Sequence, residues 1–96
     1  MIFDDKLLEQ ICTRNDIARL RIFGSVARGE DHPGSDLDLL VEFTRPKSLL
    51  ALVGIEQELE DALGRNVDLL TPAALSPYIR DQVLRDARVL YERPAA

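Results

Sequence analysis

The stretch that decides the fold of this chain is FGSVARGEDHPGSDLDLLVEF, residues 23–43. It opens on a Gly-Ser pair, Gly24 and Ser25, and after ten further residues it carries two aspartates one residue apart, Asp36 and Asp38. Residues i and i+2 of a strand point to the same face of a sheet, so these two carboxylates are expected side by side. The remainder of the chain is interpreted as the scaffold that holds these groups together.

Period-two patterning places a strand at each end of this stretch. In residues 36–43, apolar side chains at every second position predict a strand with one buried face, formed by Leu37, Leu39, Val41 and Phe43. In residues 17–23, apolar residues alternate with two arginines and predict another strand, which Gly24 ends. Between the strands, residues 25–29 suit one or two helical turns, and a Pro-Gly pair marks residues 30–35 as a loop.

Outside this stretch the sequence predicts three helices and one or two further strands. The helices are expected from Asp4 or Asp5 to about Asn15, over residues 48–63 up to Gly64, and from Ser76-Pro77 onward, and the strands over residues 66–70 and 89–91. The apolar positions expected to face the core are Leu7, Leu8, Ile11 and Cys12 in the first helix, Leu49, Leu52, Val53, Leu59 and Leu63 in the second, and Ile79, Val83 and Ala87 in the third.

The order of these elements predicts the fold class α/β (α+β), a small mixed sheet of three to four strands with helices packed on it. About a dozen residues join the first two strands, which is near the lower limit for a parallel crossover, so a mixed sheet is favoured over a wholly parallel one. A length of 96 residues suits one small core, and the pattern shows neither repeats nor a linker. Residues 1–96 are therefore expected to form a single domain.

Composition and charge exclude several classes of protein. The net charge is −5, and long nucleic-acid contacts need clustered Lys and Arg, so direct nucleic-acid binding is not expected. Cys12 is the sole cysteine, which excludes an intrachain disulfide and a cysteine-based zinc site. No stretch approaches the roughly 20 apolar residues of a membrane span, and the start of the chain lacks the pattern of a secretory signal. The expected compartment is the cytoplasm, without a membrane partner.

A third carboxylate, Asp68, lies in the strand predicted over residues 66–70. If that strand neighbours the strand of Asp36 and Asp38, three like charges gather and repel one another unless a cation neutralises them. Oxygen ligands of this kind suit a hard divalent cation, for which Mg²⁺ is the natural choice. The alternative is that these aspartates are solvated on an exposed face, because Asp-x-Asp alone is a common pattern.

The Gly-Ser pair favours a site over solvated aspartates. A glycine at the end of a strand allows a sharp turn or a close approach to a ligand, and Ser25 follows where N–H groups at a helix start and its own hydroxyl can bind a phosphate oxygen. A phosphate cradle about ten residues before a Mg²⁺-binding aspartate pair would hold a nucleoside triphosphate across both. Two metal ions would then polarise the α-phosphate and lower the pKa of an attacking hydroxyl. By itself, Gly24-Ser25 also fits a plain strand-ending turn with a helix cap.

These residues resemble the signature of the DNA polymerase β-like nucleotidyltransferase superfamily, in which a Gly-Ser pair precedes an Asp-x-Asp motif. The fuller stretch GSVARGEDHPGSDLDLLVEF is similar to the minimal nucleotidyltransferase (MNT) branch, with Ala27-Arg28-Gly29 and Ser35 also in place. The likeness continues through NVDLLTP, which contains Asp68, into VLRDARVLYE, and so covers nearly the whole chain. The fold that the resemblance implies is the polymerase β-like nucleotidyltransferase core.

The resemblance also implies roles for the carboxylates. Asp36 and Asp38 would be ligands of both Mg²⁺ ions, and Asp68 would be a ligand of the catalytic ion that also activates the attacking hydroxyl. These three residues are the expected catalytic and metal-binding residues of a nucleotidyltransferase.

The expected nucleotide contacts lie on either side of the loop. Gly24 and Ser25 would hold the β- and γ-phosphates of ATP, and Arg28 and Ser35 would add further contacts to the nucleotide. For Arg28 an alternative is an ion pair with the acidic residues that follow it in the loop.

Minimal nucleotidyltransferases of this size resemble the antitoxin halves of two-gene modules whose partner is a helical RNase toxin of the HEPN family. The resemblance implies a type VII-like antitoxin that transfers AMP from ATP to a tyrosine of its toxin and forms a hetero-oligomer with it. Two alternatives stay open: an antitoxin that neutralises its toxin by binding only, and a nucleotidyltransferase for a small molecule or an RNA end. The arginines of the C-terminal half are either a partner-facing surface or solvated helix positions: Arg80, Arg85, Arg88 and Arg93.

Overall fold

The computed structural model describes residues 4–29 and 36–94, apart from the side chains of Ser25 and Val26. The elements in chain order are α1 (Asp5–Arg14), β1 (Ile17–Phe23), α2 (Gly24–Ala27), β2 (Leu37–Phe43), α3 (Leu49–Leu63), β3 (Val67–Leu70), the 3₁₀ turn η1 (Pro72–Ala74), α4 (Pro77–Asp86) and β4 (Arg88–Glu92). Among these helices, none combines the length and the apolar character that crossing a bilayer requires.

The four strands form one mixed sheet in the order β3-β2-β1-β4. Strand β1 runs antiparallel to β2 and to β4, whereas β2 and β3 are parallel and are joined by α3 as their crossover. The predicted mixed sheet is confirmed, and the strand that carries Asp68 does lie beside the strand that carries Asp38.

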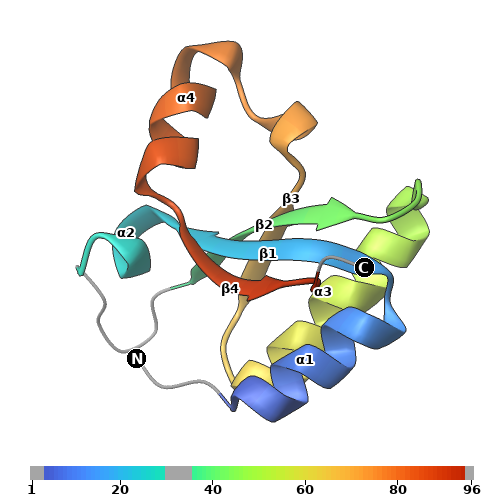
Figure 1. Cartoon of the computed structure of the whole chain (residues 1–96). Helices are drawn as coiled ribbons and strands as arrows, with labels where there is room; N and C mark the ends of the chain where they lie inside the picture. The colour runs from blue at the N-terminus through green and yellow to red at the C-terminus, as the bar shows by residue number, and fades with distance from the viewer. Residues whose placement is uncertain (1–3, 30–35, 95–96) are drawn as a thin grey trace.

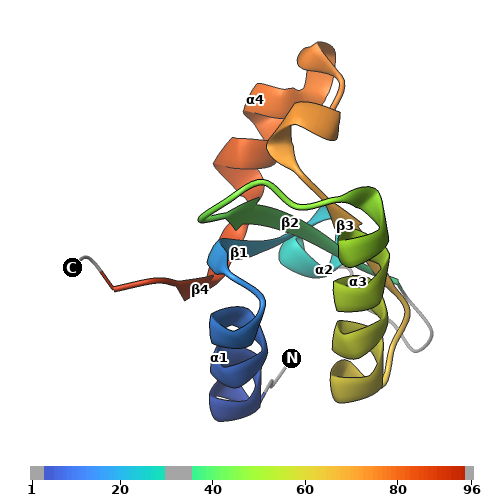
Figure 2. The same cartoon turned by 90° about the vertical axis from the view of Figure 1, so that its right-hand side faces the viewer.

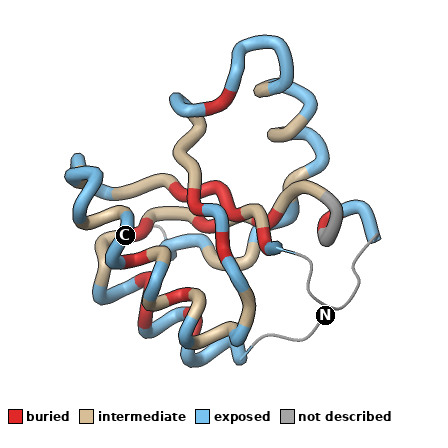
Figure 3. The backbone as a smooth tube through the Cα atoms, turned by 180° about the vertical axis from the view of Figure 1, so that it is seen from behind, coloured by how far each residue is buried: buried red, intermediate tan, exposed pale blue. Residues whose placement is uncertain are grey.

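Helices α1 and α3 cover one face of this sheet, and α4 stands on the opposite side (Figures 1 and 2). The buried residues lie mainly in the strands and along α1 and α3 (Figure 3). Ile11, Leu39 and Leu59, each at most 2% exposed, are at the centre of this core. Cys12 is also fully buried there, and burial raises the pKa of its thiol to about 12, so it packs as a small apolar residue.

Side-chain caps fix the helix boundaries close to where the sequence predicts them. The Asp4 carboxylate accepts hydrogen bonds at the start of α1, the Ser48 hydroxyl caps α3 and the Ser76 hydroxyl caps α4. Gly64 ends α3 with a left-handed backbone at φ 70°.

The predicted core face of α3 is wrong at its N-terminal end. Leu49 and Val53 are 82% and 58% exposed, and Ile55 is buried in their place together with Leu59. At 3.6 residues per turn, Val53 lies about 100° around the helix from Leu52, which does pack against the core. In α1, Leu7 is likewise more exposed than predicted, at 38%.

The prediction that α4 packs into the core is also wrong. Ile79 is 48% exposed, Val83 and Ala87 are only half-buried, and no residue of α4 is fully buried. The physical reason is that α1 and α3 already cover the apolar face of the sheet, so α4 meets the face that carries the charged side chains of β1 and β2. Helix α4 therefore lies over the second face of the sheet, where Leu40 is buried but Asp38 is only half-buried.

Asp16 links the start of the sheet to the loop that precedes α3 through a backbone hydrogen bond and two ion pairs. These ion pairs allow the electrostatic contribution to the stability of the fold to be tested. Its φ is 58°, its carbonyl accepts a 2.8 Å hydrogen bond from the Thr44 N–H, and its Oδ2 lies 2.8 Å from Lys47 Nζ and 3.4 Å from Arg45 Nε. The hydrogen bond from Lys47, aided by the charges of Arg45, Lys47 and Arg93, lowers the pKa of Asp16.

We expect Asp16→Asn to lower the stability at neutral pH, because asparagine tolerates the left-handed backbone but carries no charge. A lowered folded-state pKa contributes stability above the unfolded pKa, and this contribution is lost as the pH falls through the folded value. The difference from wild type should therefore shrink below about pH 4. Urea unfolding at pH 7 and pH 3.5 measures the difference in the free energy of unfolding between Asp16→Asn and wild type. An equal loss of stability at both pH values would show that the ion pairs of Asp16 are not its cause.

Candidate active site

Gly24 and Asp38 pack directly against each other where β1 ends. The register pairs Phe23 with Asp38 across β1 and β2, which brings the carboxylate beside the next residue along the chain, Gly24. A Cβ atom at Gly24 would overlap Asp38 Oδ2 and lie 3.1 Å from Asp38 Cγ, and the φ of Gly24 is 75°. Only glycine meets both conditions without displacing the carboxylate.

Asp68 is the register partner of Asp38 across the parallel strands β2 and β3. Directly opposite residues share a face of a sheet, so both side chains lie on the open side, away from α1 and α3. The pairing begins one residue earlier, because the Leu37 N–H donates to the Asn66 carbonyl at 2.9 Å. The position of Asp68 is therefore tied to the strand of Asp38.

The three aspartates influence one another electrostatically. Asp36 lies exposed just before β2, Asp68 is exposed on β3, and Asp38 is half-buried between them. Burial, followed by the negative charges of Asp68 and Asp36, raises the pKa of Asp38, and the charge of Arg28 opposes this effect. A carboxylate whose pKa is raised by burial and by neighbouring charges is typical of a functional site.

The chemistry of these residues suits Mg²⁺, and Asp38 and Asp68 lie on the same face of the sheet. All three offer hard carboxylate oxygens, and their mutual repulsion is what a divalent cation would relieve. Within residues 4–29 and 36–94, however, no three His, Cys, Asp or Glu side chains already form a group that could hold a metal ion. The charges of Asp36 and Asp68 thus act on Asp38, but the three side chains would have to rotate toward one another to bind a cation.

The predicted nucleotide contacts are only partly within the described residues. Arg28 follows α2, is exposed, and lies close enough to influence the Asp38 carboxylate. Ser25 lies in α2, but its side chain is outside the description, and Ser35 belongs to the residues that the structure does not describe. The roles of Ser25, Ser35 and Arg28 stay predictions.

A pocket of about 250 Å³ adjoins the site on the side of α4. Its walls are Phe23, Gly24 and Arg28 from β1 and α2, and Ile79, Gln82, Val83 and Asp86 from α4. The sequence did not indicate that α4 reaches the site, because its apolar positions favoured a helix buried in the core. Their half-exposed state is explained by this pocket.

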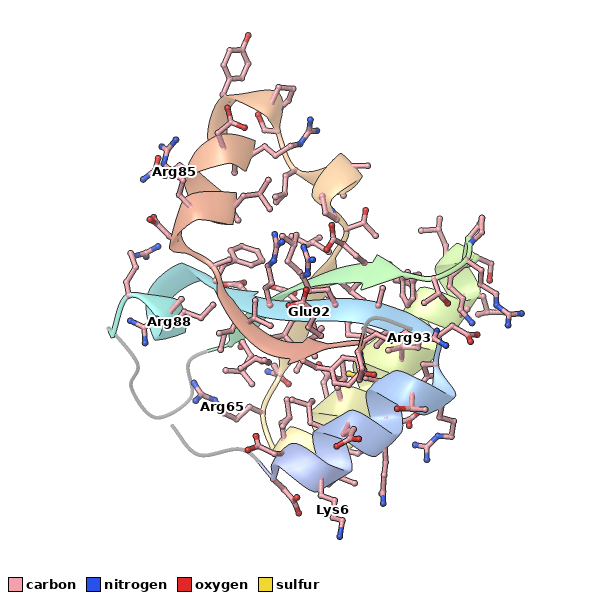
Figure 4. All side chains as sticks on the ribbon, in the orientation of Figure 1. Lys6, Arg65, Arg85, Arg88, Glu92 and Arg93 are labelled. Carbon is pink, nitrogen blue, oxygen red and sulfur yellow. The ribbon has the colours of Figure 1, made fainter. Side chains whose placement is uncertain are left out.

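The arginines of the C-terminal half do not form one surface. Arg80 is engaged locally, since its Nε and Nη2 donate to the carbonyls of Pro72 and Leu75 at 3.0 and 2.9 Å. Arg85 and Arg88 lie on the side of α4 and α2, whereas Arg93 lies at the far end of β4 (Figure 4). The interpretation of all four as one partner-facing surface is therefore not supported.

The mixed sheet, the Gly-Ser turn and the carboxylates on adjacent strands define the class of this protein. Residues 4–90 match the nucleotidyltransferase domain family, and the chain belongs to this family. It is thus an enzyme of the nucleotidyltransferase class.

Among relatives, the chain is 46% identical over 77 residues to a Methanocaldococcus jannaschii protein provisionally named protein adenylyltransferase MJ0435, covering 80% of this chain and 83% of the relative. It is 37% identical over 78 residues to the protein adenylyltransferase MntA of Thermococcus cleftensis, covering 81% and 79% of the two chains.

Among solved structures, one provisionally described as a minimal nucleotidyltransferase has 43% identity and a TM-score of 0.75, covering 88% of this chain and 86% of that one. A toxin–antitoxin crystal structure with AMP-PNP has a TM-score of 0.78 at 24% identity, covering 95% and 75%. A complex of a tri-AMPylated HEPN toxin with an MNT antitoxin from Shewanella oneidensis has a TM-score of 0.68 at 21% identity, covering 93% and 70%. The last two likenesses concern the fold alone, and together the three confirm the predicted fold class.

Proposed function

We propose that this chain is a type VII-like antitoxin that acts as a Mg²⁺-dependent protein adenylyltransferase and transfers AMP from ATP to a tyrosine of a HEPN-family RNase toxin. The observation that carries the proposal is the in-register placement of Asp38 and Asp68 beside Gly24, with Asp36 in the same electrostatic field. The names of its relatives support the choice of a protein acceptor and of AMP as the transferred group.

In the proposed reaction the tyrosine oxygen attacks the α-phosphorus of ATP. A bond forms between these two atoms, the bond from the α-phosphorus to the bridging oxygen breaks, and pyrophosphate leaves. Bound Mg²⁺ would neutralise the triphosphate and polarise the α-phosphate. Asp36 and Asp38 would hold the cations, and Asp68 would also take the proton of the attacking hydroxyl.

The nucleotide would be held at the end of β1. Gly24 and Ser25 would bind the β- and γ-phosphates through backbone N–H groups, and the missing side chain of Gly24 leaves room for the Asp38 carboxylate beside them. Arg28 would add a positive charge opposite the three carboxylates, and Ser35 a further polar contact. We place this reaction in the cytoplasm, where ATP is available, in a hetero-oligomer with the toxin.

Incubation of the chain with ATP, Mg²⁺ and a HEPN-family protein encoded by a neighbouring gene tests the proposal, and the first step is to identify that gene. We expect the intact mass of the partner to rise by one or more AMP groups, to stay unchanged with EDTA, and to stay unchanged when the acceptor tyrosine is replaced by phenylalanine. A partner that never gains AMP would overturn the proposal.

Co-expression separates chemistry from binding. With Asp36→Asn and Asp38→Asn combined, we expect the antitoxin to lose its ability to restore growth in the presence of the toxin. Full restoration of growth by this double variant would favour neutralisation by binding alone. In the incubation with ATP, AMP transfer to a small molecule or an RNA end would indicate a different acceptor.

A further inference from the structure

The outer edge of strand β3 is closed by two glutamates of α3. The Val67 N–H donates to Glu60 Oε2 at 3.0 Å, and the Leu69 N–H donates to Glu56 Oε2 at 3.0 Å. Strand β3 is an edge strand, whose outward N–H groups would otherwise have no partner in the sheet. Two side chains therefore take the place of a fifth strand.

The spacing of the glutamates matches the spacing of the strand. Glu56 and Glu60 are four residues apart and share one face of α3, while Val67 and Leu69 are two residues apart and share one edge of β3. Both glutamates are half-buried, so the hydrogen bonds are partly shielded from water. We name this arrangement, Glu56 and Glu60 with the N–H groups of Val67 and Leu69, the edge clamp.

The edge clamp lies on either side of Asp68. Strand β3 is only four residues long, and its inner edge pairs with β2 in the register that sets Asp68 opposite Asp38. Without the clamp, four residues would be held at one edge only. We propose that Glu56 and Glu60 are positioning residues of the transfer reaction, which fix the strand so that Asp68 stays opposite Asp38.

This inference rests on the proposed role of Asp68 but concerns residues that touch neither substrate nor cation. A displacement of about 1 Å at a catalytic group can cost on the order of a hundredfold in rate. Loss of the clamp should therefore lower kcat much more than it alters the KM for ATP, because the phosphate contacts are expected at the end of β1, two strands away from β3.

The same helix supplies a matched control. Glu58 lies between the two clamp residues and is also half-buried, but it pairs with Arg14 and Asn15 of the α1 region. Replacing Glu58 removes the same charge and the contacts of α3 with Arg14 and Asn15, without touching β3.

We would compare Glu60→Leu, Glu60→Gln and Glu58→Leu in two measurements, amide hydrogen exchange and the steady-state kinetics of AMP transfer to the partner. For Glu60→Leu we expect exchange at the Val67 amide to rise more than about tenfold and kcat to fall about tenfold to a hundredfold, with KM for ATP within about twofold. Glu60→Gln keeps an acceptor oxygen, so it should restore most of both properties. Glu58→Leu should leave the Val67 amide protected and kcat near wild type.

Three results would overturn the inference. A protected Val67 amide in Glu60→Leu would show that the clamp does not hold the strand. An exposed amide with unchanged kcat would show that the strand does not position Asp68, and an equal loss of kcat in Glu58→Leu would show a general effect of α3. If the wild-type chain transfers no AMP, the proposed function fails, and the exchange data still decide whether the clamp exists.

Discussion

An Asp38→Asn variant is expected to lose AMP transfer by at least about a thousandfold while its fold stays intact. Asparagine keeps the shape of the side chain but not its charge, and Asp38 is the carboxylate that contacts Gly24 and lies opposite Asp68. Transfer of labelled AMP to the partner measures the loss.

The same substitution should leave the protein as stable as wild type, or more so, when no divalent cation is present. Burial and the charges of Asp68 and Asp36 raise the pKa of Asp38, so its ionised form destabilises the folded state at neutral pH. This penalty grows as the pH rises above the unfolded pKa and disappears on acidification. The Tm difference between Asp38→Asn and wild type should accordingly narrow at acidic pH.

Asp61→Asn is the control for Asp38→Asn, because Asp61 is an exposed aspartate of α3 and the change in charge is the same. It should transfer AMP at the wild-type rate. If Asp38→Asn retained transfer, or if Asp61→Asn lost it equally, the assignment of Asp38 to the site would be wrong.

A Gly24→Ala variant is expected to lose both stability and transfer. Its new methyl group would overlap Asp38 Oδ2, and its backbone would have to keep a φ of 75°. The backbone strain alone costs about 1–2 kcal/mol. The overlap adds to this cost and pushes the carboxylate out of place, so transfer should fall by about a hundredfold or more.

Gly64→Ala separates the two causes. Gly64 has a similar φ of 70°, but nothing lies within 4 Å of the position that its Cβ would take. Gly64→Ala should therefore show the loss of stability from backbone strain with little change in transfer. Urea unfolding and the initial rates of AMP transfer measure these effects in both variants. If Gly24→Ala and Gly64→Ala transferred AMP at the same rate, the contact between Gly24 and Asp38 would not be needed for transfer.

Local signals explain which parts of the fold the sequence predicts well. The caps Asp4, Ser48 and Gly64 and the Ser76-Pro77 pair act within a few residues, so the helix boundaries follow from them. The alternation in residues 36–43 is equally local, and it predicts β2 and the place of Asp38 within it, whereas Asp36 lies just before the strand.

Features that depend on contacts between distant residues could not be predicted from the sequence. The first turns of α3 carry Leu49, Leu50, Leu52 and Val53, which are apolar on several sides, and the position of the sheet decides which of them is buried. Helix α4 has an apolar stripe, but the helices on the other face had already covered the core. The register of Asp68 and the edge clamp depend on β3, and glutamates on a helix are usually solvated.

The central place of β1 has a consequence for synthesis of the chain. Strand β1 lies between β2 and β4, although its residues 17–23 leave the ribosome long before residues 88–92 exist. During that interval one edge of the central strand has no partner and can pair with another nascent chain. A fragment that stops before β4 should therefore be prone to aggregation even though it contains Gly24, Asp36, Asp38 and Asp68.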